Sequence, residues 1–142
     1  MSWRDIRPTA LGLIWRDDEL LLQRYDAAET FYRPLGGGLE FGEQARDALV
    51  REFHEELDRE VVPRDRVGVL ENVFTFEGTP GHEVVFVFEA EFADDGAYEQ
   101  ETFEGVEDDG SGTFTASWEP VSRFVEGSAT LYPDGVVDLL DA

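Results

Sequence analysis

The chain has 142 residues and no cysteine, which fits a single domain over residues 1–142 and excludes disulfides and thiolate metal sites. Acidic residues number 33 against 11 arginines, lysine is absent, and the formal net charge is −22. This charge excludes binding of a nucleic-acid duplex through a broad basic patch, and no apolar run reaches the roughly 18 residues that would cross a membrane. No apolar leader stretch follows the N-terminus, so we expect a cytoplasmic protein.

The acidic excess predicts a fold that depends on salt. Like charges repel one another and destabilise a compact chain at low ionic strength, whereas molar salt shortens the Debye length to about 3 Å. The composition resembles that of proteins from extreme halophiles; the alternative is an acidic protein of an ordinary cell, against which the absence of lysine argues. In such a chain an anionic substrate must be held by metal and a few placed arginines.

The first part of the chain predicts strands around polar turns. Thr9–Trp15 and Leu20–Arg24 are apolar, strand-like stretches joined by the polar turn Arg16–Glu19. A polar loop and a short extended piece, Phe31–Leu35, come next. The following three glycines, Gly36–Gly38, predict an irregular backbone.

A helix is predicted from Glu43. Apolar residues recur at every fourth position from Ala45 to Leu57, which gives the segment one apolar face. Glu43 suits the positive N-terminal end of a helix, and Asp58 tolerates the backbone conformation with which helices end.

The second half predicts three strands, an acidic loop and a terminal helix. Within the second strand, Val84–Phe88 is continuously apolar, as in a central strand that is covered on both faces. The order of elements predicts an α/β (α+β) sandwich, with a mixed β-sheet flanked by helices. The predicted ranges are strands Val67–Phe76, His82–Phe92 and Thr113–Trp118, the loop Asp94–Gly112 and the helix Pro133–Leu140.

Three carboxylates of the predicted helix share one face. Glu52, Glu55 and Glu56 stand at i, i+3 and i+4, where like charges repel unless a cation lies between them. Hard cations such as Mg²⁺ bind several oxygen ligands, so a triad on a rigid helix provides a platform for them. In so acidic a chain, a solvated acidic face explains the triad alone better than a metal site does.

The residues around the triad favour a site. A glycine run precedes the helix at a fixed distance, and glycine allows a backbone to approach a ligand closely. Arg51 lies about two helical turns from Glu43, so that it can pair with Glu43 or Glu55 and orient the carboxylates. The alternative is an ordinary surface ion pair.

The spacing of these residues resembles the Nudix box of the Nudix hydrolases. The resemblance rests on Gly37, on Glu43 six positions later, and on the run Arg51–Glu56. Asp58 stands where the family usually has glycine, and Arg59 replaces an apolar residue. Both departures lie beyond the acidic cluster and concern the turn after the helix more than metal binding.

The resemblance implies the Nudix fold and the attack of water on a diphosphate linked to another moiety. It implies that Glu52, Glu55 and Glu56 bind Mg²⁺ or Mn²⁺ and that the carbonyl of Gly36 or Gly37 adds a ligand. Because many relatives are dimers, it also implies a homodimer.

Catalytic roles follow from the same resemblance. Arg51, partnered by Glu43, would orient the carboxylates, and Glu52 or Glu55 would accept the proton of the attacking water. Some family members use a glutamate outside the box instead. The weaker candidates for that role lie in the acidic loop: Glu99, Glu101 and Glu104.

Substrate-binding residues are predicted around the glycines. Arg33, Gly37 and Gly38 are the main candidates, with Arg24 and Arg123 as arginines that more often belong to a plain surface. Four aromatic residues are candidates for stacking on a base, although strand aromatics more often belong to a core: Phe31, Tyr32, Phe74 and Phe76. His54 and His82 are not expected to be ligands.

The function predicted in this way is metal-dependent hydrolysis of a small nucleotide diphosphate. Nucleotide sugars such as ADP-ribose, nucleoside triphosphates and dinucleoside polyphosphates all remain open as substrates. The alternatives are a non-catalytic Nudix-fold module that senses a nucleotide and, less consistent with the ordered spacing, an acidic protein that mimics nucleic acid.

Overall fold

The computed structural model describes residues 5–107 and 110–140. Its strands form one seven-stranded sheet in the order β4-β5-β1-β3-β2-β7-β6, with β1 also pairing to β2. β1 and β5 are parallel and the other pairs are antiparallel, so the sheet is mixed. The strands are β1 (Arg7–Arg16), β2 (Glu19–Asp26), β3 (Thr30–Gly38), β4 (Val61–Phe76), β5 (Thr79–Phe92), β6 (Thr102–Val106) and β7 (Thr113–Pro120).

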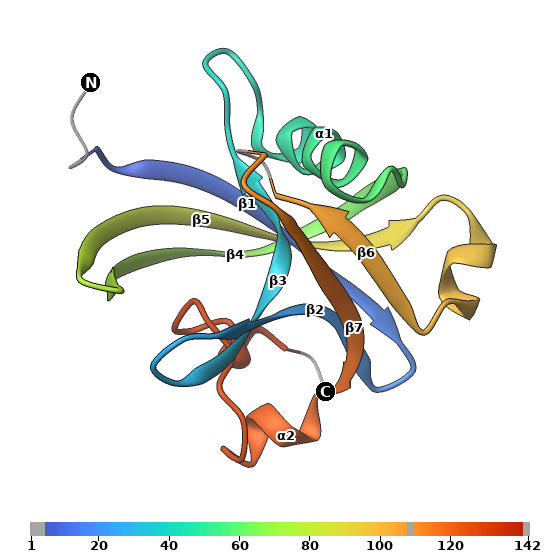
Figure 1. Ribbon diagram of the computed structural model, residues 1–142. Helices are drawn as coiled ribbons and strands as arrows, with labels where there is room; N and C mark the ends of the chain where they lie inside the picture. The colour runs from blue at the N-terminus through green and yellow to red at the C-terminus, as the bar shows by residue number, and fades with distance from the viewer. Residues whose placement is uncertain (1–4, 108–109, 141–142) are drawn as a thin grey trace.

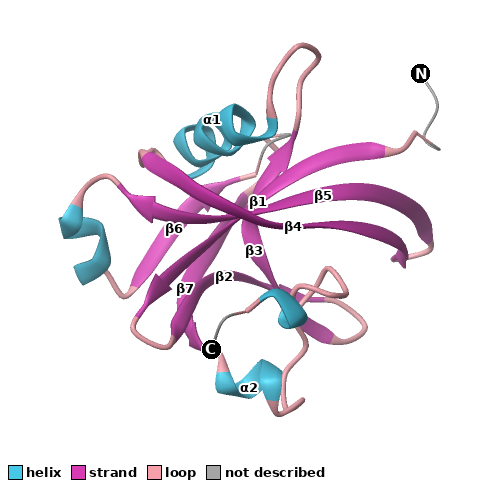
Figure 2. Cartoon of the chain, turned by 180° about the vertical axis from the view of Figure 1, so that it is seen from behind, coloured by secondary structure: helices cyan, strands magenta, loops and turns pink. Residues whose placement is uncertain are grey.

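Helical elements lie on both sides of this sheet (Figures 1 and 2). α1 (Ala45–Leu57) covers one side, whereas the short α2 (Ser122–Val125) and the C-terminal segment lie on the other. Two 3-10 turns complete the elements, η1 (Asp95–Glu99) and η2 (Val137–Leu139). The predicted α+β sandwich with a mixed, helix-flanked sheet is therefore confirmed. None of the helices in the described ranges has the length and apolar character needed to span a membrane.

The two sides of the sheet have separate apolar cores. The core under α1 includes Leu49 and Phe53, and the core under the C-terminal segment includes Phe124 and Val136. β5 contributes to both, because its alternating side chains enter opposite clusters. The prediction that Val84–Phe88 lies in a central strand covered on both faces is confirmed.

The helix α1 begins later than predicted. Its first residue is Ala45 and Gln44 is its N-cap, so the predicted start at Glu43 is wrong. Glu43 instead belongs to the preceding turn, where its carboxylate accepts a hydrogen bond from the backbone N–H of Glu40 at 3.0 Å. At the other end, Asp58 has a φ of 54° and its backbone N–H donates to the carbonyl of His54. The predicted end of the helix is confirmed.

Two predictions for the second half are wrong. The Asp94–Gly112 region is not only loop, because it contains η1 and the strand β6, whose residues alternate between exposed and buried. The segment Pro133–Leu140 forms turns and η2 instead of a helix, because Gly135 has a φ of +95°, outside the helical region. The short helix α2 was not predicted.

Candidate functional site

The three glycines lie in a strand. Gly36, Gly37 and Gly38 form the end of β3 and pair with Leu11, Ala10 and Thr9 of β1, so the predicted irregular backbone is wrong. The reason for glycine is close approach: Gly36 has a φ of +150°, and a Cβ there would overlap the carbonyl of the neighbouring strand.

Gly37 also lies directly against the helix α1. A Cβ on Gly37 would overlap the carboxylate of Glu52, which is 3% exposed. Hydrogen in place of a side chain therefore leaves room for this carboxylate beside the strand. The predicted proximity of the glycine run to the acidic helix is present in the structure.

Arg51 is the centre of the ionic contacts at this site. Its Nε donates to Glu43 Oε2 at 2.8 Å and its Nη2 to Glu43 Oε1 at 3.0 Å, a bidentate pair. Its Nη1 donates to Glu52 Oε1 at 3.0 Å and to Glu55 Oε2 at 3.1 Å, and its Nη2 donates to the carbonyl of Gly38 at 2.9 Å. Arg51 thus joins the turn, the helix and the end of β3; of these contacts, the spacing predicted the pairs with Glu43 and Glu55.

These contacts stabilise charged forms. Hydrogen bonds from Arg51 lower the pKa of Glu43 below its ordinary value, helped by the backbone N–H of Glu40. The same hydrogen bonds, chiefly that to Glu43, raise the pKa of Arg51. The guanidinium therefore remains a fixed cation inside an acidic cluster.

The three carboxylates of α1 differ in exposure. Glu52 and Glu56 are buried, at 3% and 9%, whereas the Glu55 side chain is 51% exposed. Among the described residues no group of three or more acidic or histidine side chains is gathered as a ready metal cluster. Nonetheless their carboxylate oxygens are donors of the kind that a hard divalent cation binds.

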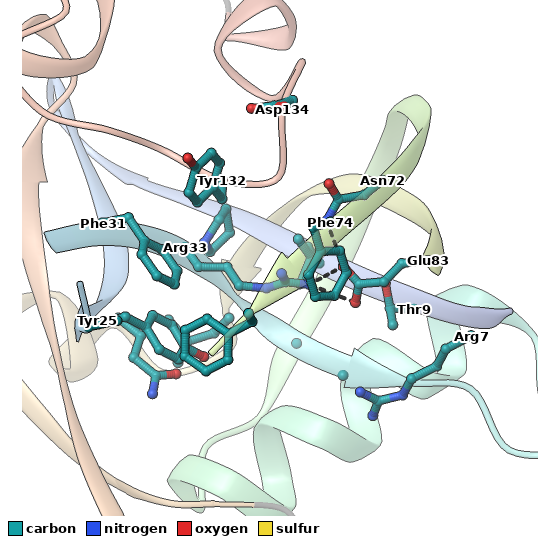
Figure 3. A pocket seen from close by; sticks show the side chains of 18 of the residues that line it. Arg7, Thr9, Tyr25, Phe31, Arg33, Asn72, Phe74, Glu83, Tyr132 and Asp134 are labelled. Atoms are coloured by element: carbon teal, nitrogen blue, oxygen red, sulfur yellow. Dashed lines mark hydrogen bonds and ion pairs between the residues drawn. The ribbon is translucent and has the colours of Figure 1, made fainter. Parts of the chain in front are cut away.

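A cavity of about 720 Å³ opens beside this cluster (Figure 3). Gly36, Gly37 and Glu56 are among its lining residues, so the acidic helix borders the cavity. Residues of β1, β2, β3, the β4–β5 hairpin and the C-terminal segment form the rest of its walls. Its volume lies in the range of small-molecule sites, which is about 300–1,000 Å³.

A buried polar network crosses the floor of the cavity. Arg33 Nη2 donates to both carboxylate oxygens of Glu83, at 3.0 and 2.9 Å, and Asn72 Nδ2 donates to Glu83 Oε1 at 3.0 Å. Glu83 is 5% exposed, and its partners offset the cost of burying its charge. Thr9, whose hydroxyl has no hydrogen-bond partner among the described residues, lies on β1 between them. These residues come from the adjacent strands β4, β5, β1 and β3.

Aromatic rings line the side of the cavity away from Arg7 (Figure 3). Tyr25 and Phe31 are stacked with centroids 4.8 Å apart, and Tyr132 and Phe76 contact Phe31 at 5.1 and 6.0 Å. Burial raises the pKa of Tyr25 to about 12, so its phenol stays neutral. Of the predicted stacking residues, Phe31, Phe74 and Phe76 line the cavity, whereas Tyr32 is buried in the core.

The other candidates lie outside the cavity. Arg24 pairs with Asp26 on the surface, and Arg123 pairs with Glu119 at 2.8 Å. Of the candidate bases in the acidic region, Glu101 contacts Arg16, and Glu104 accepts a hydrogen bond from Thr115. None of the three predicted there, nor His54 or His82, is among the residues that line the cavity.

Several lining residues were not predicted. Arg7, Tyr25, Glu83 and Tyr132 are far apart in sequence, and no local motif connects them. Glu107 is a further lining carboxylate and accepts a hydrogen bond from Gln23 at 3.2 Å. The sequence offered one signal for the cavity, namely Glu83, a charged residue next to the apolar run of β5.

The sequence matches a known protein family and several of its members. The NUDIX domain family matches residues 5–136. The NAD-capped RNA hydrolase NudC of Pseudomonas putida (strain W619) is 38% identical over 93 residues, which are 65% of this chain and 32% of that protein. The chain thus spans about a third of the length of the curated relatives that it matches.

Solved structures share the fold. The MutT protein from Methanosarcina mazei Go1 superposes with a TM-score of 0.66 and 20% identity, covering 98% of this chain and 93% of that chain. An ADP-ribose pyrophosphatase from Streptococcus suis 89-1591 superposes with a TM-score of 0.60 and 15% identity, covering 95% and 89%. At these identities the likeness concerns the arrangement of the strands and helices.

Proposed function

The chain belongs to the Nudix hydrolase family, and on that premise we propose that it hydrolyses the diphosphate linkage of a nucleoside diphosphate joined to another moiety. One observation carries the proposal. The acidic helix α1 borders, through Glu56 and beside Gly36 and Gly37, the same cavity that aromatic rings line. A diphosphate and an attached base therefore have complementary surfaces in one cavity.

Mg²⁺ or Mn²⁺ is the cofactor in this proposal. Glu52, Glu55, Glu56 and the carbonyl of Gly36 would hold it, since all offer oxygen ligands and Glu56 and Gly36 line the cavity. When bound, such a cation neutralises phosphate oxygens and lowers the pKa of a bound water. Arg51 keeps Glu52 and Glu55 oriented by donating to both, and it does so without entering the cavity lining.

The reaction needs a carboxylate that accepts a proton. The oxygen of water attacks one phosphorus, the bond to the bridging oxygen breaks, and the proton of the water goes to a carboxylate. Glu52 or Glu55 is the base within the box. Glu107 lines the cavity and is a third candidate, from the region where a glutamate outside the box was sought.

The substrate class is a nucleotide with an internal diphosphate. The similarity to a NAD-capped RNA hydrolase supports dinucleotide-like substrates, and the aromatic end of the cavity offers stacking surfaces for a planar base. Arg33 and Gly37 remain substrate-binding candidates, since both line the cavity, whereas the third candidate, Gly38, is not among the lining residues.

The test is a substrate panel in molar KCl with Mg²⁺ or Mn²⁺, comprising ADP-ribose, NADH, nucleoside triphosphates and a dinucleoside polyphosphate. Cleavage by the parent should fall at least about a hundred-fold in Glu55→Gln and Glu56→Gln, because each removes a charged oxygen ligand. Glu126→Gln, an exposed glutamate beyond α2, is the matched control and should cleave like the parent. Unimpaired cleavage in both variants contradicts the proposal, and nucleotide binding without cleavage by the parent favours the sensing module.

A further inference from the structure

Most arginines in the described part of the chain are neutralised by carboxylates. Seven of those in the described ranges form ion pairs: Arg16, Arg24, Arg33, Arg51, Arg59, Arg64 and Arg123. Arg46 donates instead to the carbonyl of Pro63. Arg7 and Arg66 have neither an ion pair nor a side-chain hydrogen bond with any residue in the described part of the chain. In a chain with 33 acidic residues, an unpaired guanidinium is the exception.

Of these two arginines, only Arg7 lines the cavity. It opens β1, and its side chain lies on the same face of that strand as Thr9 and Leu11, which also line the cavity. Figure 3 shows Arg7 at the end away from the aromatic rings. Arg66, on β4, is exposed and takes no part in the cavity.

Gly38 fixes the place of the Arg7 guanidinium. A Cβ on Gly38 would lie 2.7 Å from Arg7 Nη2 and 2.8 Å from Nε, so the guanidinium rests over the bare backbone. The carbonyl of Gly38 accepts from Arg51 at 2.9 Å. Arg7 is therefore next to the carboxylate cluster, at the diphosphate end of the cavity.

The carboxylate opposite Arg7 on β5 does not form an ion pair with it. Glu83 is the register partner of Arg7 on β5, yet its two oxygens are taken by Arg33 and Asn72. The charge of Arg33 is thereby compensated within the protein, while that of Arg7 is available to a ligand. A guanidinium presents paired N–H groups that match the oxygens of a phosphate.

We propose that Arg7 binds a phosphate oxygen of the substrate diphosphate, at the end of the cavity next to Gly38. This inference rests on the proposed function, because it assigns a substrate-binding residue within the same site. Arg33, by contrast, holds Glu83 in place on the cavity floor.

The first measurement is binding without turnover. The probe is adenosine 5′-(α,β-methylene)diphosphate, with Mg²⁺ in molar KCl, and calorimetry gives its affinity for the parent, Arg7→Ala and Arg66→Ala. Loss of one charge-assisted contact should weaken binding of this probe about ten-fold in Arg7→Ala. Arg66→Ala, which removes an equally unpaired arginine outside the cavity, should bind like the parent. Equal affinities for the parent and Arg7→Ala overturn the inference.

The second measurement separates this inference from the proposed function. With ADP-ribose, Arg7→Ala should raise KM about ten-fold with a smaller change in kcat, and Arg7→Lys should recover part of the loss. A parent that binds the probe through Arg7 but cleaves nothing contradicts the proposed function alone. A parent that cleaves ADP-ribose with the same KM as Arg7→Ala contradicts the role of Arg7 alone, and a parent that neither binds nor cleaves contradicts both.

Discussion

At the scale of single residues, we expect the contact between Gly37 and Glu52 to affect both the free energy of unfolding and the rate of hydrolysis. Gly37→Ala places a methyl group where the buried carboxylate lies, so the strand or the helix must move. We expect a loss of about 1–3 kcal/mol in the free energy of unfolding and a marked fall in turnover. Chemical unfolding and initial rates measure the two effects.

The control for that change is Gly112→Ala. No atom lies within 4 Å of a Cβ built there, and the residue has no positive φ. It should leave both stability and rate close to those of the parent. A Gly37→Ala protein that also matches the parent would show that the close approach of strand and helix is unimportant.

Glu43 predicts a pH dependence. Because Arg51 lowers its pKa in the folded state, its ion pair stabilises the fold above the ordinary value of 4.5, and this stabilisation disappears as pH falls through the lower, folded pKa. The difference in unfolding free energy between parent and Glu43→Gln should therefore be constant near neutral pH and shrink in acid. Urea unfolding at a series of pH values, in molar KCl, measures it.

Glu71→Gln, an exposed glutamate on β4 that does not line the cavity, controls for the general loss of negative charge. The difference in unfolding free energy between Glu71→Gln and the parent should not shrink in acid as the Glu43→Gln difference does. A Glu43→Gln difference that is flat across the acid range would remove the stabilising role assigned to the Arg51 pair.

At the scale of elements, the end of α1 explains the first departure from the family motif. Asp58 occupies the left-handed conformation in which glycine is favoured, and it places a negative charge at the negative end of a helix. We expect Asp58→Gly to stabilise the fold by about 0.5–1 kcal/mol. Asp58→Asn separates the effect of the charge from that of the left-handed backbone conformation, since it removes the charge and keeps a side chain. A Gly variant no more stable than the Asn variant would attribute the effect to charge alone.

The second departure, Arg59, is accommodated by packing. Its guanidinium lies 5.9 Å from the centre of the Phe103 ring and hydrogen-bonds the side chain of Gln100. An arginine stem can cover an aromatic surface as an apolar residue would, while its charged end remains polar. The substitution therefore preserves contact between the end of α1 and β6.

Sequence periodicity predicted most elements because their apolar spacing is local. It failed for β6, where Gly105 stands at a buried position and interrupts the apolar alternation, and for the C-terminal segment, where Gly135 breaks the helical pattern. The Arg51 cluster was predictable because one helix and one turn carry it. The cavity was not predictable, because four adjacent strands each contribute one residue to its floor and no short sequence motif contains all four.

At the scale of the whole molecule, the net charge of −22 predicts stabilisation by salt. Repulsion among surface carboxylates is screened as the Debye length falls from about 10 Å at 0.1 M to about 3 Å at 1 M salt. The midpoint of thermal unfolding should rise with KCl over that range. A midpoint that is insensitive to KCl would contradict the expectation of a salt-dependent fold.

The C-terminal segment has one further consequence. Leu131 forms a parallel bridge with Tyr32, and Tyr132 thereby joins the aromatic end of the cavity, more than seventy residues after the catalytic helix. Under the proposed function, one wall of the base-binding part of the cavity is thus encoded far from the acidic helix. Substitutions in the tail can alter that wall without changing the helix that carries the proposed metal ligands.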